Sequence, residues 1–485
     1  LTTSVGSSAE SIQSNGMPLE PAGRNTIRLT VDSNGGVISL RGSQLLLADA
    51  TLDGRAGGTS AVGGSLTVSS SAYSLASGAD ITLSIRQSGP VIGSEPSTIS
   101  VGSVVLDSVG SEVNGGGFFA MDSFLSGGFS DLDLGYEYFS SASIPHGGNV
   151  RFEGQIDLEA AGRIRLAAGG VVQTDDIVSI SAPYISIGQE FRAPLNPSET
   201  FAPFTDANGR ISVIPTNGPG AINLRASHVD VGTLVTMGTE QLQIIAESGD
   251  IRGAGTLSVA GEVIMESAQI YPTTLGKFDI FAYDADEATG RVTINQSGES
   301  TLPLSGGGIL RVFGTEIQQG GTLRAPFGSI TLGWDGSDLI ESTEEIDAPT
   351  NLVAGLEKSA PVASVINLLA NSETSVSAID PVTFKEIIVP FGISPDGKTW
   401  IDPRGVNVTL SGMPEKKVAI SAASVVQEPT SKIDLRGGGD LMSYRWISGT
   451  GGSIDILGSP SVWRPGSNYS AGDLVSQNGR QYSAR

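Results

Sequence analysis

The chain contains no cysteine and only two histidines, His146 and His228, among its 485 residues. The absence of thiols excludes disulfide frameworks, thiolate zinc sites and cysteine nucleophiles. Two histidines so far apart in sequence leave little material for a histidine metal site or a Ser-His-Asp triad. No apolar run approaches the roughly 20 residues that a membrane-spanning helix needs. We therefore expect no membrane insertion.

Basic side chains are also scarce, with 28 Lys and Arg against 51 Asp and Glu, for a net charge of -23. A nucleic-acid-binding protein needs a basic face to neutralise phosphates. The charge balance therefore argues against a nucleic-acid partner and against peripheral contact with anionic lipid.

Short apolar runs recur throughout the chain, and many of its 65 glycines separate them. In VRFEGQIDLEAAGRIRLAAGG (150–170) the apolar residues Val150, Phe152, Ile156, Leu158, Ile164 and Leu166 alternate with polar neighbours. This alternation predicts half-buried strands. The strands are too short and too closely spaced to have helices between them, which argues against an α/β fold.

Two all-β architectures fit such strands. A sandwich or barrel favours strands of roughly five to eight residues joined by hairpin turns. Very short strands joined by brief bends are instead typical of a right-handed parallel β-helix, in which each coil stacks on its neighbour. Glycine permits the positive φ angles that the coil corners require. We predict the β-helix, a solenoid with looped-out excursions.

The rhythm of the apolar runs divides the chain into six segments. We expect β-helix coils over 1–113, an aromatic-rich loop over 114–147, coils over 148–333 with a Pro-rich excursion near 189–219, an acidic, irregular insertion over 334–404, terminal coils over 405–457, and a small carbohydrate-binding-module-like segment over 458–485.

Two of these excursions have polar or aromatic clusters that suggest ligands. The aromatic loop is either a ligand-binding surface or a segment that folds back over apolar coil edges. The acidic run of the insertion could gather a structural calcium ion, which takes six to eight oxygen ligands. Its spacing matches no calcium-loop motif, so a solvated charge run is the simpler interpretation. The carboxylates concerned are Asp338, Glu341, Glu344, Glu345 and Asp347.

No catalytic motif stands out, although β-helices also occur in polysaccharide lyases and hydrolases. Glycoside hydrolysis needs two carboxylates held across a cleft. Asp175 and Asp176 are adjacent, which in a strand places them on opposite faces. Asp131 and Asp133 share a face, as many solvated pairs do, and Arg163 and Arg165 flank Ile164 on an outward face. We predict no catalytic residue and no enzyme; a β-helical lyase or hydrolase is the alternative.

Seven stretches between residues 128 and 457 carry a resemblance to a known family. They are GFSDLDL (128–134), VRFEGQIDLEAAGRIRLAAGG (150–170), SAPYISIG (181–188), IQQGGTLRAPFGSITLG (317–333), NSETSVSAIDP (371–381), IIVPFGISPDGKTW (387–400) and SKIDLRGGGDLMSYRWISGTGGSIDIL (431–457). LRAPFG and IDLRGGGDL are the more specific parts. Together the stretches resemble the filamentous haemagglutinins, large exoproteins of two-partner secretion in Gram-negative bacteria, and they cover most of residues 128–457.

This resemblance implies a β-helical shaft exported with an outer-membrane secretion partner and displayed or released as an adhesin or structural fibre. The Asn-Pro-Asn-Gly type signature of the family's N-terminal secretion domain is not visible, so we expect an interior or C-terminal-proximal piece. Its expected partners are further segments of the same protein or identical copies in a filament, with a divalent cation between them. Cell-surface glycans are a further possible partner.

The last stretch, VWRPGSNYSAGDLVSQNGRQYSAR (462–485), resembles small chitin-binding modules. The positions that carry the resemblance are Trp463, Tyr469, Gly472, Asp473, Val475, Gly479 and Tyr482. Sugar rings stack on aromatic faces, so Trp463, Tyr469 and Tyr482 are the candidate carbohydrate-binding residues. A structural remnant or linker module is the alternative, since the later aromatics of such modules are absent.

Overall fold

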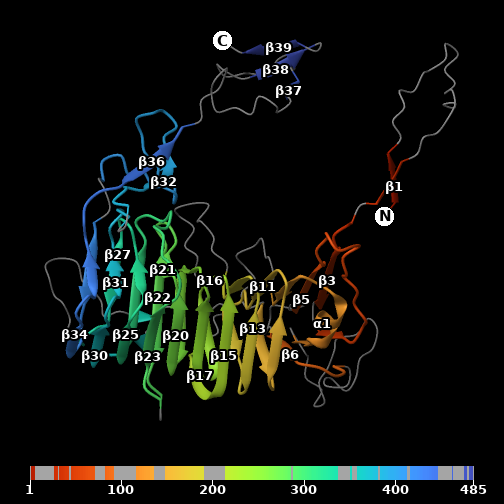
Figure 1. The fold of residues 1–485 in the computed structure, drawn as a ribbon, viewed down its shortest axis with the longest axis horizontal. Coiled ribbons are helices and arrows are strands. Elements are labelled where there is room, and N and C mark those ends of the chain that lie inside the picture. The colour runs from red at the N-terminus through yellow and green to blue at the C-terminus, as the bar shows by residue number, and fades with distance from the viewer. Residues whose placement is uncertain are drawn as a thin grey trace, which may run out of the picture.

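The computed structural model describes most of the chain as parallel β-strands (Figure 1). The residues that the structure describes are 2–5, 27–30, 32–42, 45–70, 82–91, 116–135, 148–189, 214–285, 288–336, 350–351, 358–380, 383–411, 415–445, 461–462, 474–477 and 480–483.

Successive strands go to three faces in turn, so that three strands and their corners make one coil. For example, β8 (Asp131–Leu134), β9 (Asn149–Glu153) and β10 (Ile156–Glu159) form one coil, and the strands that follow them pair in parallel with all three. Neighbouring strands in such a stack are about 4.8 Å apart. The predicted all-β parallel β-helix is confirmed.

Face A is an eleven-stranded parallel sheet. Its strands, in spatial order, are β3 (Val37–Gly42), β5 (Ser65–Ser70), β8, β11 (Arg163–Leu166), β14 (Tyr184–Ile187), β16 (His228–Val231), β18 (Asp250–Gly253), β21 (Gln269–Pro272), β26 (Thr322–Arg324), β31 (Glu373–Ser375) and β35 (Lys432–Asp434).

Faces B and C together make a 19-stranded sheet, because the long strand β17 (Leu234–Ala246) bends from one face into the other. Face B contains β4 (Leu45–Ala48), β7 (Gly116–Ala120), β6 (Thr82–Arg86), β9, β12 (Val171–Gln173), the start of β17, β19 (Gly255–Ala260), β22 (Lys277–Tyr283), β24 (Ile309–Gly314), β27 (Ser329–Leu332) and β33 (Lys417–Ile420). Face C contains β10, β13 (Ile177–Ser181), β15 (Thr216–Ala226), the end of β17, β20 (Glu262–Ser267), β23 (Arg291–Gln296), β25 (Glu316–Gln319), β30 (Val365–Leu368) and β34 (Ser424–Gln427).

The remaining elements lie outside these faces. They are β1 (Thr2–Val5) with β2 (Ile27–Thr30), α1 (Asp122–Gly127), β28 (Thr350–Asn351) with β29 (Lys358–Ser359), β32 (Ile388–Ile393) with β36 (Asp440–Tyr444), and β37 (Ser461–Val462) with β38 (Leu474–Gln477) and β39 (Arg480–Ser483).

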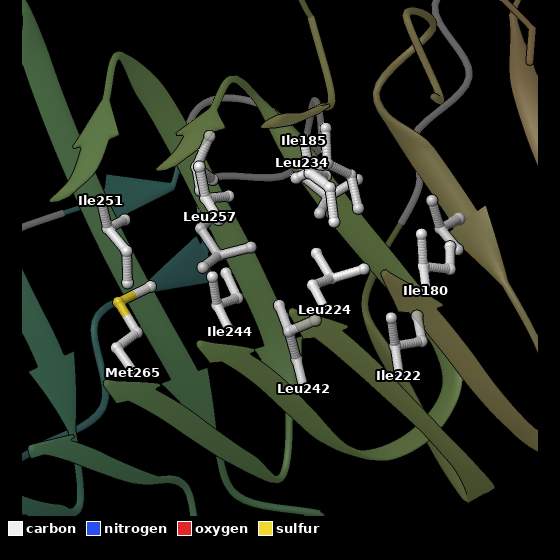
Figure 2. Packing of buried hydrophobic residues seen from close by; sticks show 14 of the residues in the cluster. Ile180, Ile185, Ile222, Leu224, Leu234, Leu242, Ile244, Ile251, Leu257 and Met265 are labelled. Carbon is white, nitrogen blue, oxygen red and sulfur yellow. The ribbon is translucent and has the colours of Figure 1, made fainter. Parts of the chain in front are cut away.

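The interior is one continuous apolar core made of like residues stacked coil on coil. Ile180, Leu224, Ile244 and Met265 occupy equivalent positions in four successive strands of face C, and each is at most 1% exposed (Figure 2). Burying an aliphatic side chain of this size contributes about 2 kcal/mol. The alternation in the sequence therefore sets which side of each strand faces inward.

The segment 114–147, expected to be an aromatic-rich loop, contains two strands of the stack. Strand β7 pairs with β4 and with β6, between which it lies although it follows both in the chain. Phe124 of α1 and Phe129 stack with ring centroids 6.1 Å apart and are buried in the core. Of the two interpretations, the described part (116–135) fits a segment packed onto the coils; residues 136–147 lie outside the described residues.

The segment 334–404 was expected to be irregular, yet β30 and β31 within it are full members of faces C and A. Residues 405–457 were expected to form terminal coils, but part of this segment lies outside the coils. Strand β36 leaves the coils to pair with β32, and Leu410, part of an expected apolar run, is 98% exposed in a turn. Val389 and Leu441 fasten the β32–β36 pair onto Phe327 of the shaft. Its local apolar pattern resembles that of a coil, but its packing partners differ.

Candidate functional site

The outer surface of face A has two columns of polar side chains that run along the stack. Parallel in-register pairing places equivalent residues of successive strands next to each other, and each strand reads polar, apolar, polar, apolar. One column contains Asp131, Arg163, Tyr184, His228, Asp250 and Gln269, and the other contains Asp133, Arg165, Ser186, Asp230, Arg252 and Tyr271. Aspartate and arginine of adjacent strands therefore lie next to each other in both columns, and an uncharged residue follows each such pair.

Asp133 is the first centre of these columns. Arg165 donates two hydrogen bonds of 2.7 Å to its carboxylate, Nε to Oδ1 and Nη2 to Oδ2. Arg163 Nη2 lies 3.8 Å from Asp133 Oδ2, and Arg163 Nε lies 4.0 Å from Asp131 Oδ2. The two arginines that were expected to be merely outward-facing are thus neutralised by the two aspartates of the preceding strand.

Asp230 is the second and most densely bonded centre. Tyr184 Oη donates a hydrogen bond of 2.6 Å to Oδ2, Arg252 donates two bonds of 2.9 and 2.7 Å, and His228 Nε2 lies 3.3 Å from Oδ1. Burial by itself raises the pKa of Asp230, but the donors His228, Arg252 and Tyr184 outweigh it and lower the pKa to about 2.

The Asp230 cluster has the residue types of an active site but not the reactivity. A carboxylate that accepts bonds from a guanidinium, a phenol and an imidazole has little capacity left to act as a base or nucleophile. Burial and the neighbouring Asp230 raise the pKa of Tyr184 to about 12, and burial raises that of Tyr271 to about 12. Both phenols therefore stay protonated at neutral pH, and the cluster serves to join adjacent coils by hydrogen bonds.

The same design continues toward β35. Glu373 accepts hydrogen bonds of 2.9 Å from Arg324 Nη2 and from Lys432 Nζ. Asp434 accepts bonds from Arg436, and Lys432 Nζ lies 3.3 Å from its Oδ2. Arg324, in the LRAPFG motif, is only 1% exposed, and desolvation lowers its pKa.

A shallow hollow of about 270 Å³ is the second candidate site. Its lining residues are Glu240, Gln241, Glu262, Ala288, Thr289 and Arg291. Glu262 accepts a 2.9 Å hydrogen bond from Gln241 Nε2, and Arg291 Nη2 lies 2.8 Å from Glu316 Oε2. Among the residues that the structure describes, Glu240 and Glu262 are the two carboxylates that line this hollow.

Most of the candidate site residues predicted from the sequence lie outside face A and the hollow. Trp463, Tyr469 and the acidic run 338–347 lie outside the described residues. Tyr482 is half-exposed in β39, where it pairs with Val475 of β38, so the structure does not show the three aromatics together. Asp175 and Asp176 occupy a bend, where the Asp176 carboxylate accepts a hydrogen bond from the Ile177 amide.

The charge columns were missed by sequence reasoning, although a signal existed. DLDL, RIRL, YISI, HVDV, DIRG and QIYP align as equivalent four-residue segments, and the alignment alone puts Asp beside Arg. The number of possible pairs grows with every coil, so predicting the pairing requires the coil-to-coil register, which long excursions obscure.

Within the described ranges, no three His, Asp or Glu side chains gather as metal ligands would. In the same ranges, no helix is both long and apolar enough to cross a membrane. No family model matches the chain, and no curated protein or solved structure matches it either.

Proposed function

We propose that this chain is a structural and adhesive segment of a large bacterial surface fibre and acts by non-covalent contact, not by catalysis. The observation that carries the proposal is the pairing of charges along face A. Asp133 and Asp230 are each buried against an arginine of the neighbouring strand, and Glu373 pairs in the same way with Arg324, so these ion pairs join one coil to the next. Such carboxylates stabilise a shaft and are poorly suited to acid-base chemistry.

The resemblance of residues 128–457 to filamentous haemagglutinins supports the same proposal. It adds export to the outer surface of a Gram-negative bacterium by an outer-membrane secretion partner. A stack of coils is quasi-one-dimensional, so its length grows with the number of coils while each coil contacts only its neighbours. That property suits a fibre.

The last coil that the structure describes has features that favour a partner at its end. Val425 and Ile433 occupy inward positions, opposite Ile366 and Thr374, yet they are 47% and 36% exposed. Among the described strands, β33, β34 and β35 each pair on one edge alone. Free strand edges beside exposed core residues favour another strand. We propose that further coils, from the same protein or from a second copy, stack here.

The alternative function, a polysaccharide lyase or hydrolase, has the hollow at Glu240 and Glu262 in its favour. The direct test is to incubate the protein with neutral and acidic polysaccharides and to assay both retention and release of reducing or unsaturated ends. The fibre proposal expects retention without product. If product is released by the wild type but not by Glu240→Gln or Glu262→Gln, the fibre proposal is wrong and the chain is an enzyme.

A further inference from the structure

Face C has a continuous column of partly exposed outward residues. On face A the outward residues Asp133, Asp230 and Asp434 are at most 4% exposed, and on face B the outward Phe281 and Phe313 are completely buried. The outward residues in the middle of face C are instead all partly exposed. This face therefore presents a continuous stack of side chains to solvent.

The central column of face C has no charge along most of its length. Asp157 lies at one end of the column, and in-register pairing then aligns, in order, the uncharged residues Ser179, Asn223, Gln243, Ile264, Thr293, Gln318, Asn367 and Val426. Asn367 Nδ2 donates a 3.2 Å hydrogen bond to Gln318 Oε1, so the amides are linked along the axis. Each amide or hydroxyl offers both donors and acceptors.

Several of the charges beside this column are paired with one another. Arg291 lies between Glu262 and Glu316 in the column two residues earlier, with Nη1 3.8 Å from Glu262 and Nη2 2.8 Å from Glu316. On the other side Arg225 pairs with Glu247. The central column therefore offers hydrogen-bonding capacity, and Glu266 adds a negative charge beside it, which disfavours anionic ligands.

We propose that the central column of face C binds a neutral polysaccharide laid along the fibre axis. Hydroxyl groups are donors and acceptors at once, as are the amides that repeat at strand spacing of about 4.8 Å. Many weak contacts along one chain add up to firm retention. The inference rests on the proposed adhesive function and names its surface and ligand class.

Net charge favours a neutral polysaccharide on face C over an acidic polysaccharide or a second copy of the chain. A net charge of -23 repels acidic polysaccharide and a second copy of the same chain lying face to face. A neutral chain of sugars meets no such repulsion. The repeating, uncharged column is therefore better matched to a neutral glycan than to either competitor.

The test compares two triple variants in pull-downs with insoluble cellulose, chitin and mannan, and with cross-linked pectate as the acidic probe. Gln243→Ala with Thr293→Ala and Gln318→Ala alters the central column. Gln173→Ala with Thr256→Ala and Thr331→Ala makes matched changes on the outside of face B, where these residues are also partly exposed. Equal melting temperatures of the two variants establish that both fold.

We expect the wild type to bind at least one neutral polysaccharide, the face C variant to bind it about tenfold more weakly, equivalent to about 1.4 kcal/mol, and the face B variant to match the wild type. Unchanged binding by the face C variant would overturn the inference. Loss of polysaccharide binding in Tyr482→Ala alone would do the same. Both results would still be compatible with an adhesive function. Pectate bound as well as the neutral probes, or no binding to any, also overturns it. Product release would instead refute the proposed function.

Discussion

Arg165 and Asp133 lie side by side on adjacent strands of face A and are joined by two hydrogen bonds of 2.7 Å. Their side chains are 20% and 4% exposed, so the pair is largely removed from water. It connects residues 32 positions apart in the chain and fixes the register of β11 on β8. The pairing of opposite charges between adjacent coils thus holds the stack in register from outside, while the apolar core holds it from within.

Replacing Asp133 by Ala should lower the free energy of unfolding by about 2 kcal/mol, the usual loss for hydrogen bonds to a charged group. Arg163 and Arg165 then lose their shared carboxylate and repel each other. Asp157→Ala is the matched control, because that exposed aspartate on β10 should tolerate the change within about 0.5 kcal/mol. Urea unfolding measures both, and equal midpoints would show that the pairing does not stabilise the stack.

Ile164→Asp should be among the most destabilising single changes in the chain. Ile164 is completely buried, so the substitution places an unpaired carboxylate in the core at a cost of several kcal/mol. Ile177→Asp makes the identical change at an outward position that is 48% exposed, and it should be close to neutral. Thermal melts followed by circular dichroism give the comparison. Similar melting temperatures would mean that the inward and outward faces are assigned the wrong way round.

Arg163→Ser should have a small effect, at most about 1 kcal/mol, because the partly exposed Arg163 contacts its aspartates only at 3.8 and 4.0 Å. Arg165→Ser, which removes the two short bonds to the buried Asp133, should cost clearly more. The ordering of the two midpoints in urea is the measurement, and a larger loss at position 163 would contradict the assignment.

The Asp230 cluster predicts a loss of stability in acid. Its three donors hold the pKa of Asp230 at about 2, below the ordinary value of 3.8. The stabilisation is therefore fully present above about pH 4 and is lost as the pH falls toward 2. Asp230→Asn should be less stable than the wild type at pH 6, and the difference should shrink at pH 2.5. A difference independent of pH would rule out titration of this carboxylate as its cause.

The aromatic cluster on the outside of face B should contribute as much to the free energy of unfolding as packing in the core does. Phe313 is fully buried, with its ring centroid 5.0 Å from that of Phe281, and Trp334 packs against the cluster. Phe313→Ala should cost about 3 kcal/mol and shift the tryptophan fluorescence to longer wavelength. Phe384→Ala removes a ring that is 70% exposed and should do neither. Unaltered fluorescence in the first variant would argue against the cluster.

The β-helix could be predicted from the sequence because its signal is local and repeated. Alternation around Ile156, Leu158, Ile164 and Leu166 marks four inward positions without any knowledge of which strands are neighbours, and all four are buried in the core. The residues of each strand by themselves indicate which side of that strand faces inward. The repetition of that pattern along the chain then identifies the fold.

The order of strands could not be predicted where it departs from the order of the chain. Nothing near Gly116 shows that β7 inserts between β4 and β6, because its position depends on distant edges. Likewise β21 pairs directly with β26, so residues 297–308 contribute no strand to face A. Both features depend on interactions across many residues.

The Asp230 cluster illustrates the same division for the candidate site. The types of its residues are visible in YISI, HVDV and DIRG, but their convergence depends on the pairing of β14, β16 and β18. The excursion between β14 and β15 makes that pairing invisible to local patterns. Without it, His228 was an isolated histidine and Asp230 an ordinary polar residue.

The central claim, that this chain is a fibre segment with a free coil edge, is tested most directly by sedimentation velocity over a range of protein and calcium concentrations. The wild type should form end-to-end assemblies that grow with concentration, and negative-stain images should show rods of increasing length. Val425→Lys with Ile433→Lys places charges on the exposed edge and should leave single rods. A compact monomer that is independent of protein and calcium concentration, and identical in the wild type and the double variant, would contradict the account.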